Sequence, residues 1–136
     1  MADCIFCAIA SGEGPAEILD SDEHTVAFMD INPATRGHSL VIPRKHSADL
    51  MEVSDSDLER TTIAARRLAA RIKEALEPDG FNILNACGPV AWQTVFHFHL
   101  HVIPRYRDDP LKLPWIPRGA EMSELSRIAA QIRGDA

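Results

Sequence analysis

The sequence has no long hydrophobic run, and its basic residues are too few to balance its acidic ones. No stretch of the 136 residues approaches the roughly 18 consecutive apolar residues that a membrane-spanning helix needs. Lysine and arginine number 14 against 20 aspartates and glutamates, which gives a net charge of −6. Nucleic acids and anionic membranes are bound by clustered basic side chains, so we expect neither as a partner. A small anionic ligand remains compatible, because one pocket can be positive within a negative protein.

Cysteine is also scarce, with three residues in the whole chain. Three cysteines in a reducing compartment are not expected to build a disulfide framework. The first residues, Met-Ala-Asp-Cys-Ile-Phe-Cys, show no charged start followed by an apolar segment, so a secretory signal is not expected. We therefore expect a cytoplasmic protein with reduced thiols.

What is present is the composition of one ordinary globular domain. Hydrophobic residues make up 46% of the chain and charged residues 25%, which is enough apolar material for one core. No repeat, low-complexity run or linker interrupts it. Residues 1–136 are therefore expected to form a single domain.

Hydrophobic periodicity and turn residues predict three helices and five strands. Ser54 can cap a long amphipathic helix that has acidic residues in its first turn and stops at Glu77-Pro78-Asp79-Gly80. Pro43 and Pro104 are expected to end the strands before them. This order of elements favours an antiparallel α+β sheet over a doubly wound fold. The other predicted elements are helices at 4–11 and 123–133, and strands at 17–19, 25–29, 39–42, 81–84 and 95–103.

Three histidines alternate with apolar residues in the last predicted strand. Strand side chains point alternately to the two faces, so His97, His99 and His101 are expected to share one face. Like charges disfavour one another, so at least one ring is expected to be neutral near pH 7, as a nucleophile must be. A solvated strand face and a three-histidine metal site are the alternatives. The opposite face, which the long helix can cover, consists of Phe96, Phe98, Leu100 and Val102.

The run His97-Phe98-His99-Leu100-His101-Val102-Ile103 resembles the signature of the histidine triad (HIT) family, in which histidine alternates with apolar residues. Other landmarks of the family are spread along the chain. They are Cys-Ile-Phe-Cys-Ala-Ile at 4–9, Ala-Phe-Met-Asp-Ile-Asn-Pro at 27–33, Gly-His-Ser-Leu-Val-Ile-Pro-Arg-Lys-His at 37–46 and Gln-Thr-Val-Phe at 93–96. The resemblance spans residues 1 to about 105, which leaves 106–136 as a C-terminal tail and helix.

The resemblance implies a fold and an assembly. HIT-like proteins have a five-stranded antiparallel sheet with two main helices. They usually form a homodimer in which the long helices and one sheet edge meet to give a ten-stranded sheet, and a dimer would also cover an exposed edge strand. In relatives the C-terminal segment reaches the active site of the partner subunit, so Trp115 is an expected neighbour of that site.

The resemblance also implies an enzyme. Family members are nucleotide hydrolases and transferases that act at the α-phosphate of purine nucleoside phosphoramidates or dinucleoside polyphosphates. By similarity, His99 attacks phosphorus and forms a covalent nucleotidyl-histidine, His101 donates a hydrogen bond to a phosphate oxygen, and His38 supports them from a neighbouring strand. The expected ligand is a purine nucleotide such as AMP or an adenosine phosphoramidate. The alternative is a zinc-stabilised nucleotide-binding module that acts through partners, with incidental turnover.

Further positions match nucleotide-binding residues of the family. Asp30 is expected to accept hydrogen bonds from ribose hydroxyls, with a local turn bond as the alternative. Gln93 and Thr94 are expected to meet the phosphates and the leaving group. The remaining positions are expected to line the pocket, with core packing as the alternative for the apolar ones: Ile5, Phe6, Ile9, Phe28, Ile31, Asn32 and Asn85. The chain departs from the family pattern at Ala86, Cys87 and Trp92, so the resemblance does not fix the leaving group.

Cys4 and Cys7 form a C-x-x-C pair at the start of the sequence. A redox pair of this kind usually follows a strand in a βαβ unit, which this pair does not. Zinc requires four ligands in a tetrahedron. One branch of the family carries a zinc bound by two cysteines and two histidines, and its matching positions here are Cys4, Cys7, His46 and His97. The resemblance thus implies a closed, structural Zn²⁺ site, with two reduced and unliganded cysteines as the alternative.

Overall fold

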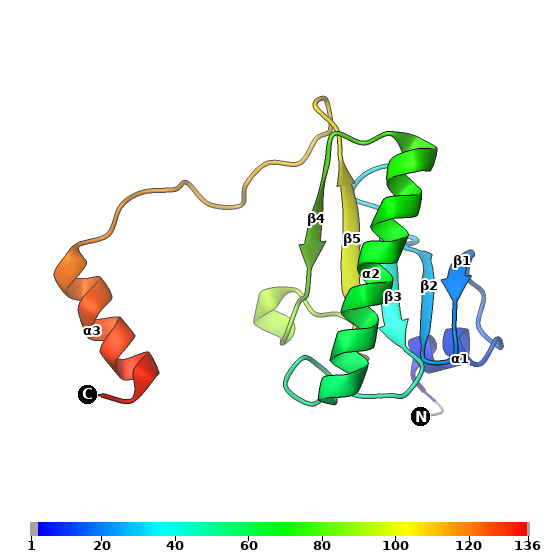
Figure 1. The fold of residues 1–136 in the computed structure, drawn as a ribbon, viewed down its shortest axis with the longest axis horizontal. Helices are drawn as coiled ribbons and strands as arrows, with labels where there is room; N and C mark the ends of the chain where they lie inside the picture. The colour runs from blue at the N-terminus through cyan, green and yellow to red at the C-terminus, as the bar shows by residue number, and fades with distance from the viewer. Residues whose placement is uncertain (1–2, 136) are drawn as a thin grey trace.

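Five antiparallel strands form one sheet in the order β1-β2-β3-β5-β4, which confirms the predicted α+β class (Figure 1). The structure is a computed structural model and describes residues 3–135. Its strands are β1 (Ile18–Ser21), β2 (Thr25–Met29), β3 (Ser39–Pro43), β4 (Gly80–Leu84) and β5 (Leu100–Arg105). Its helices are α1 (Ile5–Ala10), α2 (Asp55–Leu76), α3 (Met122–Arg133) and a 3-10 turn at Pro89–Ala91.

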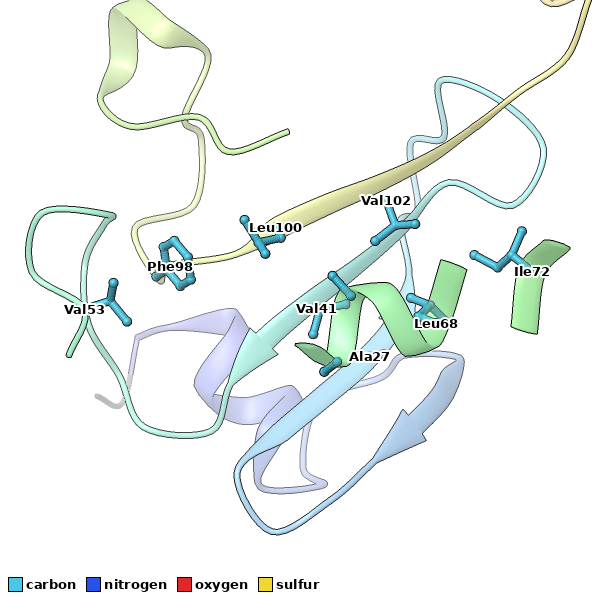
Figure 2. Close-up of a cluster of buried hydrophobic side chains, with 10 residues drawn as sticks. Ala27, Val41, Val53, Leu68, Ile72, Phe98, Leu100 and Val102 are labelled. Carbon is cyan, nitrogen blue, oxygen red and sulfur yellow. The ribbon is translucent and has the colours of Figure 1, made fainter. Parts of the chain in front are cut away.

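Helix α2 begins and ends where the sequence predicts. The Ser54 hydroxyl accepts a hydrogen bond from the backbone N–H of Asp57 at 3.1 Å, which satisfies one free donor of the first turn. Glu77 ends the helix in the left-handed region, with a φ of 52°. One face of α2 lies across the sheet and forms the larger core (Figure 2), whose members include Ala27, Val41, Leu68, Ile72, Phe98, Leu100 and Val102.

The opposite face of the sheet carries the second core, which helix α1 covers. Phe6 and Ile9 of α1 pack against the side chains of Val26, Phe28 and Leu40. The rings of Phe6 and Phe28 meet edge to face, with centroids 5.3 Å apart. The histidine run faces this side of the sheet, because the rings of His97 and His99 both lie edge-on to Phe6.

The strand predicted at 95–103 is wrong at both ends. β5 starts only at Leu100, because the preceding residues bond elsewhere: the N–H of Phe98 donates to the carbonyl of Ser47 at 2.7 Å. At the other end β5 continues through Pro104 to Arg105, because β4 still pairs with it there, with Phe81 opposite Pro104 and Gly80 opposite Arg105. Phe98 is fully buried against α2 as predicted, but the prediction for Phe96 is wrong, since 46% of its surface is exposed.

Two other predicted boundaries also shift. β1 continues to Ser21 and the hairpin turn lies after it, because the Asp22 carboxylate accepts hydrogen bonds from the backbone N–H groups of His24 and Thr25. Strand β3 includes Pro43, whereas Pro43 was expected to end the strand before it. Neither shift changes the order of the elements.

Residues after β5 leave the body of the protein as an extended arm that ends in α3 (Figure 1). Arg105 and Asp109 anchor its start through two hydrogen bonds, Nε–Oδ2 at 2.8 Å and Nη2–Oδ1 at 2.9 Å. Helix α3 begins at Met122, one residue before the predicted start, and Glu121 at its N-terminus makes no side-chain capping bond. Among residues 3–135, no helix combines the length and the apolar character that crossing a membrane requires.

Candidate active site and metal centre

His99 lies at the end of the loop that leads into β5, with only 4% of its surface exposed. Its Nδ1 is 2.7 Å from the carbonyl oxygen of His97, and because a carbonyl only accepts, Nδ1 carries the proton and donates. Burial lowers the pKa of His99, although the hydrogen bond to His97 and the charge of Asp30 oppose the shift. The neutral ring therefore presents an unprotonated Nε2.

A hydrogen bond joins the rings of His38 and His101 beside it, and we call this hydrogen-bonded pair the relay. The backbone N–H of Ala34 donates to Nδ1 of His38 at 2.9 Å, so the proton of the neutral His38 ring sits on Nε2. That Nε2 is 2.9 Å from Nδ1 of His101, which must accept, so His101 carries its own proton on Nε2. The relay thus presents an N–H donor from His101, and the rings of His99 and His101 are 5.0 Å apart by their centroids.

Burial keeps this relay neutral more than mutual repulsion does. It is the largest cause that lowers the pKa of His38, and Asp30 opposes it from 3.4 Å. Burial, followed by the proximity of His99 and His38, lowers the pKa of His101 to about 4. The expectation of neutral rings therefore agrees with these pKa directions, but desolvation is the larger reason.

The His101 ring is expected to titrate far below the usual range for histidine. Its Cε1–H resonance, followed by NMR from pH 8 to 3.5, should stay at the neutral position through pH 6 and move with a midpoint of about 4. Because the folded state resists a proton that the unfolded chain accepts near pH 6.5, stability should fall as the pH drops from about 6.5 toward 4. A midpoint near 6.5 would contradict the buried relay.

A cavity of about 190 Å³ opens beside these rings, between α1, β2 and the loop before β5. Its walls are mostly apolar, while Asp30, His99 and His101 provide polar groups. Of the residues predicted for the site, the structure places ten in the lining: Ile5, Phe6, Ile9, Phe28, Asp30, Ile31, Asn32, Thr94, His99 and His101. Sequence reasoning missed five others, of which Met29, Leu40 and Val95 lay in segments already quoted for the family: Pro15, Ala16, Met29, Leu40 and Val95.

The Asp30 carboxylate divides its two oxygens between two environments. Oδ1 accepts a hydrogen bond from the backbone N–H of Asn32 at 2.7 Å, which is the local turn bond of the alternative interpretation. Oδ2 lies 3.4 Å from Nε2 of His38 and 3.9 Å from Nδ1 of His101. Asp30 thus holds its loop in place and also adds negative charge next to the relay.

The structure does not bring Asn85 and Gln93 into the wall of the cavity. The amide nitrogen of Asn85 donates to the carbonyl of His99 at 3.0 Å. The Gln93 amide accepts from the N–H of Gly88 at 2.8 Å and donates to the carbonyl of Ala48 at 2.8 Å. Both side chains therefore bond to backbone groups instead of facing the cavity: Asn85 bonds to His99 itself, and Gln93 bonds to Gly88 and Ala48.

Cys4, Cys7, His46 and His97 converge on the other side of the triad, with their ligand atoms within 4.8 Å of one another. The His97 ring donates from Nε2 to the carbonyl of Pro43 at 2.8 Å, so its Nδ1 lone pair faces the two thiols. That nitrogen is 3.5 Å from each sulfur and 3.3 Å from Nδ1 of His46. A tetrahedral zinc with bonds of about 2.05 Å to nitrogen and 2.3 Å to sulfur places such atoms about 3.3 and 3.5 Å apart. The residues therefore fit the ion.

The cluster joins three separate parts of the chain. Cys4 caps α1, accepting a hydrogen bond at Sγ from the N–H of Cys7, while His46 follows β3 and His97 precedes β5. A second group, Asp30 with His38 and His101, is as compact. However, Nε2 of His38 and Nδ1 of His101 are 2.9 Å apart and share a hydrogen bond, so a proton fills the space that an ion would need.

Comparison with known proteins places the chain in a family. Residues 11–108 match the HIT domain model. The chain is 45% identical over 106 residues to an uncharacterized HIT-like protein of Methanocaldococcus jannaschii, covering 78% of this chain and 81% of that protein. Two crystal structures resemble it over 99% of its length. SMU.412c from Streptococcus mutans UA159 is 33% identical with a TM-score of 0.93 over 86% of that chain. A zinc-bound histidine triad family protein from Mycobacterium smegmatis is 40% identical with a TM-score of 0.78 over 99% of that chain. This protein therefore belongs to the HIT domain family.

Proposed function

We propose that this protein is a nucleotide-binding hydrolase that cleaves at the α-phosphate of purine nucleoside phosphoramidates or dinucleoside polyphosphates. The observation that carries the proposal is the protonation pattern of the site. His99 offers a bare Nε2, while the hydrogen bonds of the relay give His101 a proton on Nε2. One nucleophile and one donor on neighbouring rings are what attack at a phosphoryl group requires.

The reaction would proceed in two displacements. Nε2 of His99 forms a bond to the α-phosphorus, and the P–N or P–O bond to the leaving group breaks, with its electron pair staying on that group, which takes a proton from solvent. Water then attacks the same phosphorus and gives up a proton to solvent, the P–Nε2 bond breaks, and the nucleoside monophosphate leaves with His99 restored. His101 would donate its Nε2–H to a non-bridging oxygen as charge develops.

The hydrogen bond between His99 and the His97 carbonyl would stabilise the covalent intermediate. Bonding phosphorus to Nε2 gives the ring a positive charge, and Nδ1–H then donates more strongly to the carbonyl 2.7 Å away. The Asp30 carboxylate adds a favourable charge nearby, since it raises the pKa of His99 against the effect of burial. The loop thus stabilises the nucleotidylated histidine without any movement of a proton from Nδ1.

The lining of the cavity fits the rest of a nucleotide. Phe6, Phe28 and the isoleucines of α1 would enclose the base, and Oδ2 of Asp30 is available to ribose hydroxyls because only Oδ1 is used by Asn32. Thr94 lines the same cavity as His99, and its hydroxyl would contact a phosphate. Asn85 and Gln93 would act by positioning the loop that carries His99.

We further propose that Cys4, Cys7, His46 and His97 hold one structural Zn²⁺. Four protein ligands close the tetrahedron and leave no position for water, so the metal would contribute to folding. Because α1 supplies both cysteines and the Phe6 wall, the ion would also fix one side of the nucleotide cavity. The reduced thiols that it needs agree with the cytoplasmic location expected from the sequence.

The assembly that we propose is a homodimer joined along β4. This strand is an edge of the sheet, and Ile83 on it is 51% exposed. Pairing two such edges would give the ten-stranded sheet and remove an unpaired row of backbone groups. The leading alternative in function, a nucleotide-binding module without useful turnover, would share this assembly.

Turnover and binding measured on the same preparation separate these two functions. Purified protein is expected to release AMP from both an adenosine 5′-phosphoramidate and a diadenosine polyphosphate, at rates well above a blank without protein. AMP is expected to bind with a stoichiometry of one per chain by calorimetry. If AMP binds but no substrate of either class is turned over, the protein is a binding module and the hydrolase proposal is wrong.

A further inference from the structure

Trp92 has a backbone conformation that suits glycine better than tryptophan. Its φ is 79° and its ψ is 15°, which is the left-handed region. Among residues 3–135, Glu77 is the only other non-glycine residue with a positive φ, and it ends α2. A bulky residue is an outlier in this region, because its Cβ crowds the following carbonyl oxygen, whereas glycine has no Cβ. The loop therefore carries Trp92 at a cost in stability.

Hydrogen bonds on both sides of Trp92 hold this conformation in place. Its N–H donates to the carbonyl of Pro89 at 3.1 Å, which closes the 3-10 turn. The N–H of Gln93 donates to the carbonyl of Gly88 at 3.1 Å, and the N–H of Gly88 donates back to Oε1 of Gln93 at 2.8 Å. The Gln93 side chain is anchored in turn, because its Nε2 donates to the carbonyl of Ala48 at 2.8 Å. The backbone at Trp92 is therefore fixed.

The Trp92 indole contributes little to the fold. Its residue is 65% exposed and belongs to neither hydrophobic core. Within residues 3–135, the indole makes no contact with another aromatic ring, and its N–H donates to no partner. Strained backbone positions of this kind cluster at functional sites. The combination of strain and exposure indicates that Trp92 contacts a ligand.

Trp92 lies at the mouth of the cavity beside His99. Thr94 lines that cavity and is exposed, and the two residues of chain between Trp92 and Thr94 span at most about 7 Å. His99 is only 4% exposed, so it forms the floor. In an in-line displacement the leaving atom lies on the far side of the phosphorus from the nucleophile. The leaving group of a bound nucleotide therefore points from His99 toward the mouth.

The size of the cavity leaves part of a large substrate outside it. Its volume of about 190 Å³ lies below the roughly 300–1,000 Å³ of sites that enclose a drug-sized ligand. One half of a dinucleoside polyphosphate can occupy it, and the second purine base then lies outside. Aromatic side chains stack on nucleobases of any sequence, because every base has a flat face. The ammonia released from an adenosine phosphoramidate has no such face.

We propose that Trp92 stacks on the second purine base of a dinucleoside polyphosphate and makes this the preferred class of substrate. The inference rests on the proposed hydrolase function and chooses between its two substrate classes. Trp92 is thus a specificity-determining residue that contacts the leaving nucleotide and takes no part in the attack by His99. Because the loop already fixes the backbone of Trp92, less conformational entropy is lost when the substrate binds.

Two substrates that are attacked at the same phosphorus test the stacking. In Trp92→Gly, kcat/KM for diadenosine triphosphate should fall at least about tenfold, because the stacked base loses its partner. The value for adenosine 5′-phosphoramidate should stay within about twofold of wild type. Trp92→Asn tolerates the left-handed backbone without a ring and should match Trp92→Gly, whereas Trp92→Phe keeps a ring and should retain most of the preference.

Val90→Ala is the matched control, because Val90 lies in the same turn and is 97% exposed. It should leave both kcat/KM values unchanged. If the ratio of the two values in Trp92→Gly equals the wild-type ratio, whether or not both values fall, the stacking is overturned and the hydrolase proposal is intact.

Tryptophan fluorescence tests the contact without turnover. The chain has two tryptophans, so Trp115→Phe leaves Trp92 as the only one. A methylene-bridged, non-hydrolysable analogue of diadenosine triphosphate should quench the Trp92 emission in a saturable manner, whereas AMP should leave it unchanged. No quench by the analogue, or an equal quench by AMP, overturns the stacking. A wild-type protein that cleaves neither substrate overturns the hydrolase proposal, and a quench by the analogue alone would still support the stacked base.

Discussion

Replacing His99 with alanine is expected to reduce turnover by at least about 10³-fold, because only binding and electrostatic stabilisation remain once the nucleophile is gone. The nucleophile is Nε2 of His99, which carries no proton because the proton of the neutral ring is on Nδ1 and is donated to the His97 carbonyl. AMP affinity should change by less than about tenfold, since the apolar walls and Asp30 are untouched. Steady-state kinetics with an adenosine phosphoramidate and calorimetry with AMP measure the two effects.

His24→Ala is the matched control for this substitution. His24 lies in the hairpin turn after β1, is not part of the cavity lining, and has a side chain that is 42% exposed. Because His99 is buried, the alanine variant leaves a void, so His99→Asn provides a variant that fills more of it. If either His99 variant keeps a tenth of the wild-type rate, while His24→Ala is unchanged, the nucleophile has been assigned to the wrong residue.

Loss of zinc is expected to have the largest effect on stability. Removing the ion with a chelator, or replacing Cys7 with serine, should lower the free energy of unfolding by about 3 kcal/mol or more, since a closed metal site couples directly to folding. For a chain of this length that corresponds to a fall in Tm of about 10 °C. Thermal unfolding followed by circular dichroism, before and after re-addition of zinc, measures the shift.

The same experiment tests whether the metal takes part in the chemistry. At a temperature where the zinc-free protein is still folded, kcat should stay within about threefold of the wild-type value, while KM rises because α1 and its Phe6 wall are loosened. Cys87→Ser changes the one cysteine outside the cluster and should leave both Tm and KM unchanged. Immediate loss of kcat on chelation of the folded protein would indicate a catalytic metal and contradict a purely structural one.

Local signals predicted the parts of the fold that depend on local chemistry. The bounds of α2 follow from the Ser54 cap and from the Glu77-Pro78 stop, both of which act on the helix within one turn. The start of β5 could not be predicted in this way. It depends on the hydrogen bond from Phe98 to Ser47, a residue far away in the sequence, and alternation of side chains alone cannot show where backbone pairing begins.

The candidate site, too, could be predicted from the sequence only in part. The residue types and their strand alternation indicate a face of histidines, and the structure places His97 and His99 with α1 on that side of the sheet. Which nitrogen carries each proton depends on partners that only the fold supplies, such as the Ala34 N–H and the His97 carbonyl. Likewise, the sequence predicts α3 as a helix, but its periodicity does not show that Met122, Leu125, Ile128 and Ile132 are exposed in the structure.

The most direct test of the central claim is the mass of the intact protein during turnover. Samples quenched within the first turnovers of an adenosine phosphoramidate should contain a species heavier by one AMP less one water, with the adduct mapped to His99 and absent from His99→Ala. The phosphorus–nitrogen bond should be stable in alkali and cleaved by mild acid. Turnover at full rate with no such species, under quenching that preserves a synthetic phosphohistidine standard, would contradict a nucleotidyl-histidine intermediate.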